Sequence, residues 1–274
     1  SLEDFSAAPV ELYRRLIDHH QLRWLHDGVF RMACGAIINA MWDLWAKSES
    51  KPLWKLLVDL EPEFVVACID WRHLQDALSP DEALAILKTA KAQKVTREQE
   101  MSVLGPKAYC TAGWLGLSDE AILETVLKLQ ETGFDAFKLK VGQDLESDVA
   151  RLQFLRDALG PDQSLMVDAN QYWGVDEAKE HIGHYLPFEL KWVEEPIARD
   201  DVLGYCELSE TFEGASFKFA CGEQAASPVI FKQLLKSGGI GYCQIDAVRV
   251  AGVNDVRSKV ENVGASFNLV SKVL

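Results

Sequence analysis

Three acidic residues recur at nearly equal intervals in the second half of the sequence. Asp168, Glu194 and Glu223 are 26 and 29 residues apart, and each follows a short apolar run. A strand, a helix and their two loops need about this length, so the spacing places the three carboxylates at the ends of successive strands. Close carboxylates repel one another unless a cation lies between them, and ligation by oxygen alone suits Mg²⁺. The pattern predicts a magnesium site, with three unrelated acids in surface loops as the alternative.

Two lysines, Lys138 and Lys140, come one interval earlier within an apolar run. Side chains two residues apart point to the same face of a strand, so we expect both ammonium groups to face the acids. Neighbouring cations lower each other's pKa, which favours one lysine as a general base. A base that faces a metal-bound carboxylate can remove the proton on the adjacent carbon while the metal stabilises the enediolate. The alternative, two lysines on the solvent face of an edge strand, fits poorly with their apolar neighbours.

Six short apolar runs supply the strands that these residues need. The runs start 28, 28, 26, 27 and 24 residues apart and comprise residues 108–112, 136–141, 164–168, 190–194, 217–220 and 241–246. Helical patterns lie between them, as at 120–132, 145–159 and 228–237. This period predicts a βα repeat with a parallel sheet, either an open doubly wound sheet or part of a (β/α) barrel of the TIM type.

The carboxyl ends of the six runs distinguish these two architectures. Polar and charged residues gather there: Lys140, Asp168, Asn170, Glu194, Glu195, Glu223 and Asp246. In a barrel these ends converge on one mouth, whereas an open sheet spreads them along a line. We therefore expect an α/β fold, an incomplete TIM-like barrel of about six βα units.

The first part of the chain has a mostly helical pattern. Residues 10–60 show helical spacing, with a long apolar stripe over 29–47 and a short helix over 53–57 that follows Pro52. Residues 64–71 are apolar and are predicted to form a buried strand. The next helix is expected to begin at Ser79, a capping residue that is followed by proline and acids.

The composition narrows the class of protein. The 274 residues are 48% hydrophobic and 26% charged, which is typical of a folded globular protein, and their net charge is −14. An acidic surface disfavours nucleic acid and anionic membranes as partners, and no apolar run is long enough to span a membrane. Six widely spaced cysteines predict reduced thiols. We expect a cytoplasmic protein, or a mitochondrial one if a transit segment was removed.

The motifs around the candidate residues resemble one family in their order and spacing. They are Lys138-Leu139-Lys140-Val141-Gly142, Val167-Asp168-Ala169-Asn170, Val193-Glu194-Glu195-Pro196, Gly222-Glu223-Gln224 and Gln244-Ile245-Asp246. Together they resemble the enolase superfamily, in its mandelate-racemase-like subgroup. Further stretches resemble its sugar-acid dehydratase branch, which includes L-fuconate and L-galactonate dehydratases: residues 21–24, 39–47, 112–116 and 230–234.

The resemblance implies a catalytic role for several residues. Lys140 matches the base that takes the α-proton, and Lys138 matches its electrostatic neighbour. Asp246 matches an aspartate that orients a catalytic histidine on the next barrel strand. The family's Mg²⁺ ligands match three acids: Asp168, Glu194 and Glu223.

The resemblance also implies a substrate site and a division of the chain. Asn170 matches a polar residue that lines the site, and we expect Trp114 and Glu195 to contact the substrate there. Residues 1–62 are expected to be the helical part of a capping domain, and residues 63–274 a partial barrel.

The sequence departs from the family's pattern at one catalytic group. The histidine that acts as the acid for the departing 3-hydroxyl is absent, because all six histidines precede Asp246. His181 and His184 fall on a helix that we expect outside the barrel. The expected capping sheet and two last βα units are also missing, and residues 257–262 lack the helical stripe expected there. We therefore expect a chain truncated at both ends that forms a homo-oligomer through its open edges.

Two classes of function are consistent with these features. The first is a Mg²⁺-dependent lyase-type enzyme that abstracts the α-proton of a small hydroxy acid or sugar acid, with dehydration impaired or altered. The second is a non-catalytic or repurposed relative with a binding or structural role, or with a different isomerisation or cyclisation reaction. The acid triad and the two lysines favour the enzyme.

Overall fold

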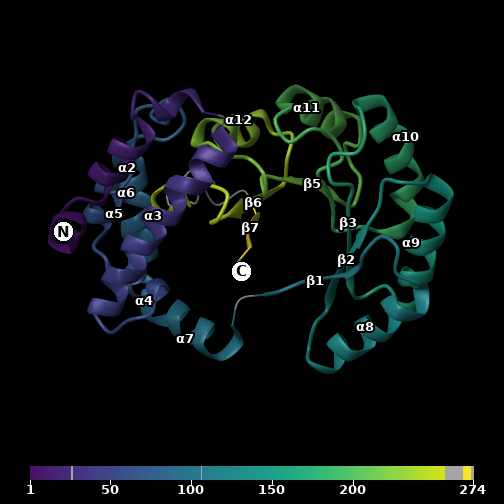
Figure 1. Cartoon of the computed structure of the whole chain (residues 1–274). Coiled ribbons are helices and arrows are strands. Elements are labelled where there is room, and N and C mark those ends of the chain that lie inside the picture. The colour runs from purple at the N-terminus through teal and green to yellow at the C-terminus, as the bar shows by residue number, and fades with distance from the viewer. Residues whose placement is uncertain (26, 106, 257–267, 273–274) are drawn as a thin grey trace. The chain divides into compact units, whose positions relative to one another are not determined.

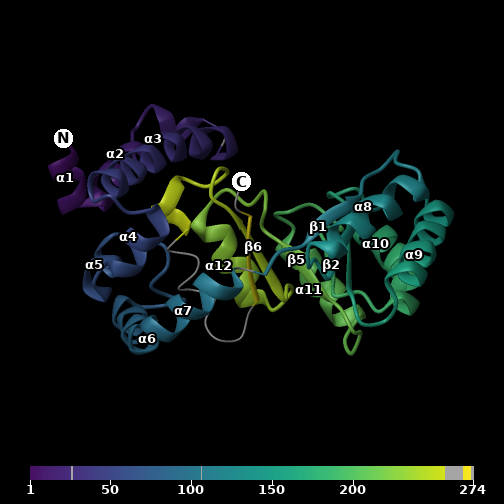
Figure 2. The same cartoon turned by 90° about the horizontal axis from the view of Figure 1, so that it is seen from below.

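The computed structural model describes residues 1–25, 27–105, 107–256 and 268–272 of the chain. The chain divides into two compact units, whose elements are labelled in Figures 1 and 2. Unit 1 comprises Ser1–Gly105, Gly222–Lys236 and Cys243–Leu274, and unit 2 comprises Pro106–Cys221 and Ser237–Tyr242. The domain boundary expected at residue 62 stays a prediction.

Unit 2 is built on a parallel sheet whose strands follow one another in chain order. β1 pairs with β2, β2 with β3, β3 with β4 and β4 with β5, always in parallel. The strands are β1 (Cys110–Gly113), β2 (Ala136–Lys140), β3 (Ser164–Asp168), β4 (Trp192–Glu194) and β5 (Lys218–Cys221). The sixth predicted strand is β6 (Tyr242–Asp246), most of which belongs to unit 1. All six strands lie within two residues of the positions predicted from the apolar runs.

A helix follows each of the first four strands of unit 2, and these helices lie on one side of the sheet in Figure 1. The N-terminal caps of α8, α9 and α11 are Ser118, Asp144 and Asp201, each of which accepts a backbone N–H from the first turn. The helices are α8 (Asp119–Glu131), α9 (Leu145–Leu159), α10 (Val175–Tyr185, continued by the short helix η2, Leu186–Phe188) and α11 (Val202–Thr211). The bounds of α9 are those predicted from the sequence.

Unit 1 consists mainly of helices, as the helical pattern of its residues predicts. Its elements are α1 (Leu2–Ala7), α2 (Pro9–Ile17), η1 (Leu22–Trp24), α3 (Asp27–Ser48), α4 (Leu53–Asp59), α5 (Pro62–Ala67), α6 (Pro80–Ala92), α7 (Lys94–Leu104), α12 (Pro228–Ser237), β6 and β7 (Asn268–Lys272). β7 is the neighbour of β6 and was not predicted. The prediction for residues 257–262 lies outside the described residues.

The core of unit 1 forms where α3 packs against the segment that follows β6. Ile38 and Trp42 of α3 are fully buried, and the Trp42 indole N–H donates to Asn254 Oδ1 at 2.9 Å. Gly35 permits this close approach, because a Cβ atom there would lie 2.5 Å from the carbonyl oxygen of Val250. Ala251 and Val253 join the same apolar cluster.

The strand predicted over residues 64–71 is wrong. Residues Pro62–Ala67 form the helix α5, and Cys68 is its C-terminal cap, with φ −76° and ψ −9°. A short apolar run fits a buried helix as well as a buried strand, and its valines favoured the wrong choice. Pro62, which occupies the first turn of α5, was the local signal for a helix. The cap predicted at Ser79 is confirmed, because Ser79 and Glu82 form a reciprocal capping box.

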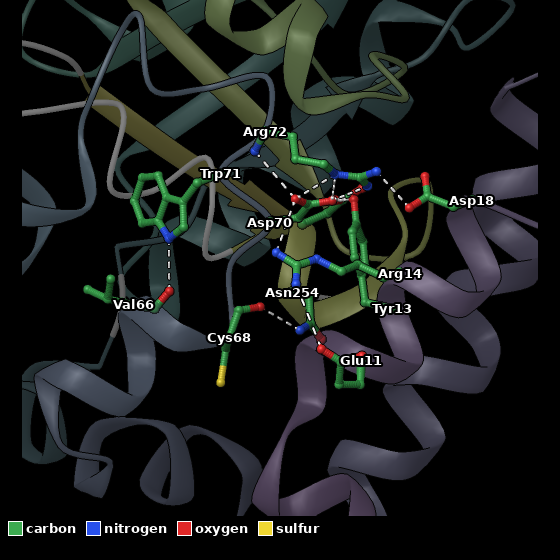
Figure 3. A network of polar contacts seen from close by, with 11 residues as sticks. Glu11, Tyr13, Arg14, Asp18, Val66, Cys68, Asp70, Trp71, Arg72 and Asn254 are labelled. Carbon is green, nitrogen blue, oxygen red and sulfur yellow. Dashed lines mark hydrogen bonds and ion pairs between the residues drawn. The ribbon is translucent and has the colours of Figure 1, made fainter.

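A polar network joins α2 to the segment after α5 (Figure 3). Asp70 accepts hydrogen bonds from Arg72 and lies 3.5 Å from an Arg14 guanidinium nitrogen. Arg72 also forms an ion pair with Asp18 at 2.7 Å. Burial raises the pKa of the Asp70 carboxyl, but its hydrogen bonds with Arg72 outweigh this and hold that pKa below its ordinary value. The network therefore favours the ionised Asp70.

None of the helices in the described residues is long and apolar enough to cross a membrane.

We predict that Tyr13→Phe lowers the free energy of unfolding by about 1.5 to 3 kcal/mol, the range for a hydrogen bond to a charged group. The Tyr13 hydroxyl donates to Asp255 Oδ1 at 2.6 Å in a buried position, and the variant removes that donor. Urea unfolding measures the change. Tyr172→Phe is the matched control, since the side chain of Tyr172 is 62% exposed. Equal stability of the two variants would contradict a stabilising role for the buried hydrogen bond.

Candidate active site

Two buried lysines of β2 form the centre of the candidate site in unit 2. The side chain of Lys138 is 1% exposed and that of Lys140 is 10% exposed, although both carry a charged head group. Lys138 Nζ lies 2.7 Å from Glu194 Oε2 and 3.1 Å from Asp168 Oδ2. Lys140 Nζ donates to Asp168 Oδ2 at 2.5 Å and to Asn170 Oδ1 at 2.7 Å. The structure thus brings together five of the residues singled out in the sequence.

Strand register explains why these residues meet. Lys140 is the register partner of Asp168 in the β2–β3 pair, and Asp168 is the partner of Glu194 in the β3–β4 pair. Because parallel strands in register place equivalent side chains side by side, three charged positions form one row across the sheet. Lys138 lies two residues before Lys140 and so contacts the same carboxylates from the same face.

The charges of this cluster balance one another. Breaking a buried ion pair by removing one partner typically costs about 3 to 5 kcal/mol, because an uncompensated charge is left behind. Burial lowers the pKa of Lys138, but the attraction of Glu194 and Asp168 outweighs it and holds that pKa above its ordinary value. Burial likewise raises the pKa of Asp168, and the two lysines bring it below its ordinary value. We expected the neighbouring cations to lower each other's pKa; at Lys138 the carboxylates dominate.

An aromatic ring lies beside each lysine. Lys138 Nζ is 5.1 Å from the centre of the Tyr109 ring, and Lys140 Nζ is 5.2 Å from the centre of the Trp114 ring. Such cation–π contacts are attractive and help to hold each side chain against its ring. The Trp114 side chain follows β1 and is 55% exposed, so it presents an aromatic surface next to Lys140.

The loops after β3 and β4 are tied to each other. The carboxylate of Asp168 accepts a hydrogen bond from the backbone N–H of Asn170 at 2.9 Å. This bond holds the backbone of the residue whose side-chain oxygen contacts Lys140. Gln171 donates its backbone N–H to the Glu195 carbonyl at 2.7 Å and its side-chain amide to Glu195 Oε2 at 2.8 Å. Asn170, Gln171 and Glu195 all have positive φ, at 48°, 65° and 38°. Such strained backbone persists only where the surrounding contacts hold it, as these do.

Glu223 and Asp246 belong to unit 1, where one arginine connects them. Arg249 Nε lies 3.3 Å from Asp246 Oδ2, and its Nη2 lies 3.8 Å from Glu223 Oε1. Gly222, with φ +124°, lets the chain before Glu223 approach β6, because a Cβ there would lie 2.4 Å from the Gln244 carbonyl oxygen. Sequence reasoning missed Arg249. The only signal was a basic residue three positions after Asp246.

The Asp168 and Glu194 carboxylates of unit 2 are chemically suited to bind a hard cation. Asp168 and Glu194 are adjacent oxygen donors of the kind that Mg²⁺ prefers. The ammonium groups of Lys138 and Lys140 neutralise them in this arrangement. Within the described residues, no three His, Cys, Asp or Glu side chains form a ready-made metal cluster.

The two late histidines lie on a helix of unit 2, as predicted. His181 and His184 are on α10, and the His181 ring packs against Trp173 at 4.7 Å between ring centres.

Comparisons with known proteins identify the family. The family model described as enolase C-terminal domain-like matches residues 121–266. The human protein named mitochondrial enolase superfamily member 1 is 43% identical over 246 residues, which are 89% of this chain and 56% of that protein. L-galactonate dehydratase of Hypocrea jecorina is 40% identical over 250 residues, with the same shares covered. The chain thus spans about half the length of these relatives.

Solved structures agree with this likeness. The crystal structure of human mitochondrial enolase superfamily member 1 matches with a TM-score of 0.95 and 39% identity, over 100% of this chain and 63% of that one. L-talarate dehydratase from Polaromonas sp. JS666, complexed with Mg and L-glucarate, matches with a TM-score of 0.58 and 26% identity, over 88% and 63%. The predicted fold class, an incomplete TIM-like barrel, is confirmed. The chain belongs to the enolase superfamily.

Proposed function

We propose that the chain acts as a Mg²⁺-dependent lyase-type enzyme on a small hydroxy acid or sugar acid. The contact of Lys140 Nζ with both Asp168 and Asn170, at a site that an open aromatic ring borders, is the observation that carries the proposal. A lysine held next to carboxylate ligands is placed to remove a proton from the carbon beside a bound substrate carboxylate. The sugar-acid dehydratase among the relatives supports this substrate class.

The proposed metal ligands are Asp168, Glu194 and Glu223. Asp168 and Glu194 are register partners at neighbouring strand ends, and Glu223 follows the next strand, β5, in the sequence. Magnesium, when bound, supplies positive charge that stabilises negative charge developing on the substrate. The structure of L-talarate dehydratase with Mg and L-glucarate supports the choice of metal.

The residues of unit 2 divide the remaining work. Lys140 takes the α-proton as a neutral amine, once its own extra proton has passed to solvent, and Lys138 remains charged because its carboxylate partners hold its pKa high. Asn170 holds the Lys140 amine through its side-chain oxygen. Trp114 and Glu195 are proposed to contact the substrate, Trp114 through its exposed ring and Glu195 from the loop after β4, which Gln171 of the loop after β3 holds by hydrogen bonds.

Dehydration needs a second group, an acid that protonates the departing hydroxyl. In the family's pattern Asp246 orients a histidine for this purpose, but this sequence has no histidine after Asp246. Asp246 instead faces Arg249, and a guanidinium is a poor proton donor. We therefore propose that these 274 residues by themselves remove the α-proton faster than they dehydrate the substrate. A homo-oligomeric state and a cytoplasmic or mitochondrial location stay predictions.

We predict that Glu194→Gln weakens Mg²⁺ binding by at least about tenfold, since even the loss of a group that only supports a ligand costs 10- to 100-fold. Isothermal titration calorimetry with MgCl₂ measures the affinity. Glu180→Gln is the matched control, because Glu180 is an exposed acid on α10. Equal affinity of the wild type and Glu194→Gln would remove Glu194 from the proposed metal site.

We predict that the protein exchanges the α-proton of L-galactonate with solvent deuterium and forms little 2-keto-3-deoxy product. The missing acid accounts for the difference, since general acid catalysis contributes about 10²- to 10⁴-fold. Proton NMR in D₂O follows both reactions. Exchange should vanish in Lys140→Met and without Mg²⁺, and persist in the control Lys128→Met, which alters an exposed lysine of α8.

Full-rate dehydration would show that another group supplies the acid. Absence of exchange with L-galactonate and L-fuconate, despite bound Mg²⁺, would favour the non-catalytic or repurposed alternative.

A further inference from the structure

The guanidinium of Arg151, on α9, binds the backbone at the ends of two strands. Its Nη1 donates to the carbonyl oxygen of Lys140 at 2.9 Å, and its Nη2 donates to the carbonyl oxygens of Trp114 at 3.0 Å and Gly113 at 3.4 Å. The Arg151 side chain is 12% exposed. One buried cation thus connects the last residue of β2 with the first residue after β1.

The pairing between β1 and β2 is irregular at this place. The register shifts between Thr111 and Gly113, and β1 ends with Gly113 opposite Leu139, one residue before Lys140. On the other side of β2, the pairing with β3 extends one residue further, because the Val141 N–H donates to the Asp168 carbonyl at 3.0 Å. Arg151 therefore holds the Lys140 backbone on the side where the regular ladder with β1 has ended.

A second residue of α9 fixes the turn that follows β2. Asp148 Oδ2 accepts the Gly142 N–H at 2.7 Å and the Tyr185 hydroxyl at 3.2 Å, and Asp148 is 1% exposed. Gly142 has φ +116°, a conformation that favours glycine. Residues 148 and 151 lie one turn apart and so bracket the backbone on both sides of Val141.

We propose that Arg151 is a positioning residue for Lys140 and Trp114, which it sets relative to each other through their backbone carbonyls. The side chains of the same two residues meet in the cation–π contact of 5.2 Å. A guanidinium suits this role because its rigid planar fork holds its N–H donors in fixed directions, toward carbonyl oxygens at the ends of two different strands. The inference deepens the proposed function, since it concerns the lysine that the proposed function uses as a base.

The same helix offers a matched control in Arg156. Its guanidinium likewise donates to backbone carbonyls, those of Gly160, Gln163, Phe188 and Glu189. These carbonyls follow α9 and α10 and are not at the ends of β1 and β2. Arg156→Gln therefore removes a comparable set of hydrogen bonds without altering the backbone of Lys140 or Trp114.

The test compares Arg151→Gln, Arg151→Lys and Arg156→Gln in the full chain by two measurements. The first is the rate at which acetic anhydride modifies the Lys140 amine in the metal-free protein, read by mass spectrometry. The second is the kcat and the KM for α-proton exchange of L-galactonate with Mg²⁺ present. Thermal unfolding of each variant shows that it is folded, and Arg151→Lys, which keeps the charge, serves if Arg151→Gln does not fold.

We expect Arg151→Gln to raise the modification rate of Lys140 severalfold and to lower kcat by about 10²-fold with little change in KM, the cost of misplacing a reacting group by about 1 Å. Arg151→Lys should give intermediate values and Arg156→Gln wild-type values. Equal Lys140 modification in Arg151→Gln and Arg156→Gln would overturn the proposal. Wild type without any exchange would overturn the proposed function instead, and the modification rates would still decide the role of Arg151.

Discussion

Lys138 and Lys140 can be buried in unit 2 only because Asp168 and Glu194 are buried against them. Each of these charges would be costly in the interior without its partners, and each carboxylate accepts from at least one lysine. This requirement also fixes the sheet. A slip of one residue between β2 and β3 would turn the lysines to the opposite face, where the fully buried Phe137 and Leu139 now lie. The register of the strands and the geometry of the candidate site therefore depend on the same contacts.

The backbone around the charged cluster is held from outside the sheet. Gln171 of the loop after β3 donates two hydrogen bonds to Glu195 of the loop after β4. Three residues of these loops have positive φ: Asn170, Gln171 and Glu195. Behind β2, helix α9 contacts the backbone through Arg151 and Asp148. The hydrogen bonds between neighbouring strands stop at the strand ends, which leaves backbone groups there without sheet partners. Polar side chains of the helix that covers the sheet bind these groups and so fix the backbone at the strand ends.

Unit 1 supports the other two acids in a different way. Its long helix α3 packs on the segment after β6 through a glycine and two buried side chains, and Asp255 of that segment joins Tyr13 and Arg31. The same segment carries Asp246 and Arg249, so the helical part of the chain and these two residues form one packed body. One arginine, Arg249, lies between Asp246 and Glu223, whereas in unit 2 two lysines face the two carboxylates of Asp168 and Glu194. The positive charge beside each pair of acids thus comes from the same unit as the acids.

The sequence by itself determined the order of strands and helices in unit 2 and which acids stand at strand ends. Apolar period and chain spacing are local properties, so the bounds of α9 and the row formed by Lys140, Asp168 and Glu194 could be predicted from them. The same local reading failed at residues 64–71, because a short apolar run fits a buried helix as well as a strand.

Only the tertiary structure decided how these residues are charged and held. Proximity of the lysines alone predicts a lowered pKa, whereas the packed carboxylates raise the pKa of Lys138. Arg151 carries no local signal of its role, because a surface arginine and one that binds the carbonyls of distant strands look alike in a sequence. Gln171 and Glu195, both at positive φ, are likewise joined by hydrogen bonds between two loops. These features depend on contacts between residues far apart in the chain, which local periodicity does not encode.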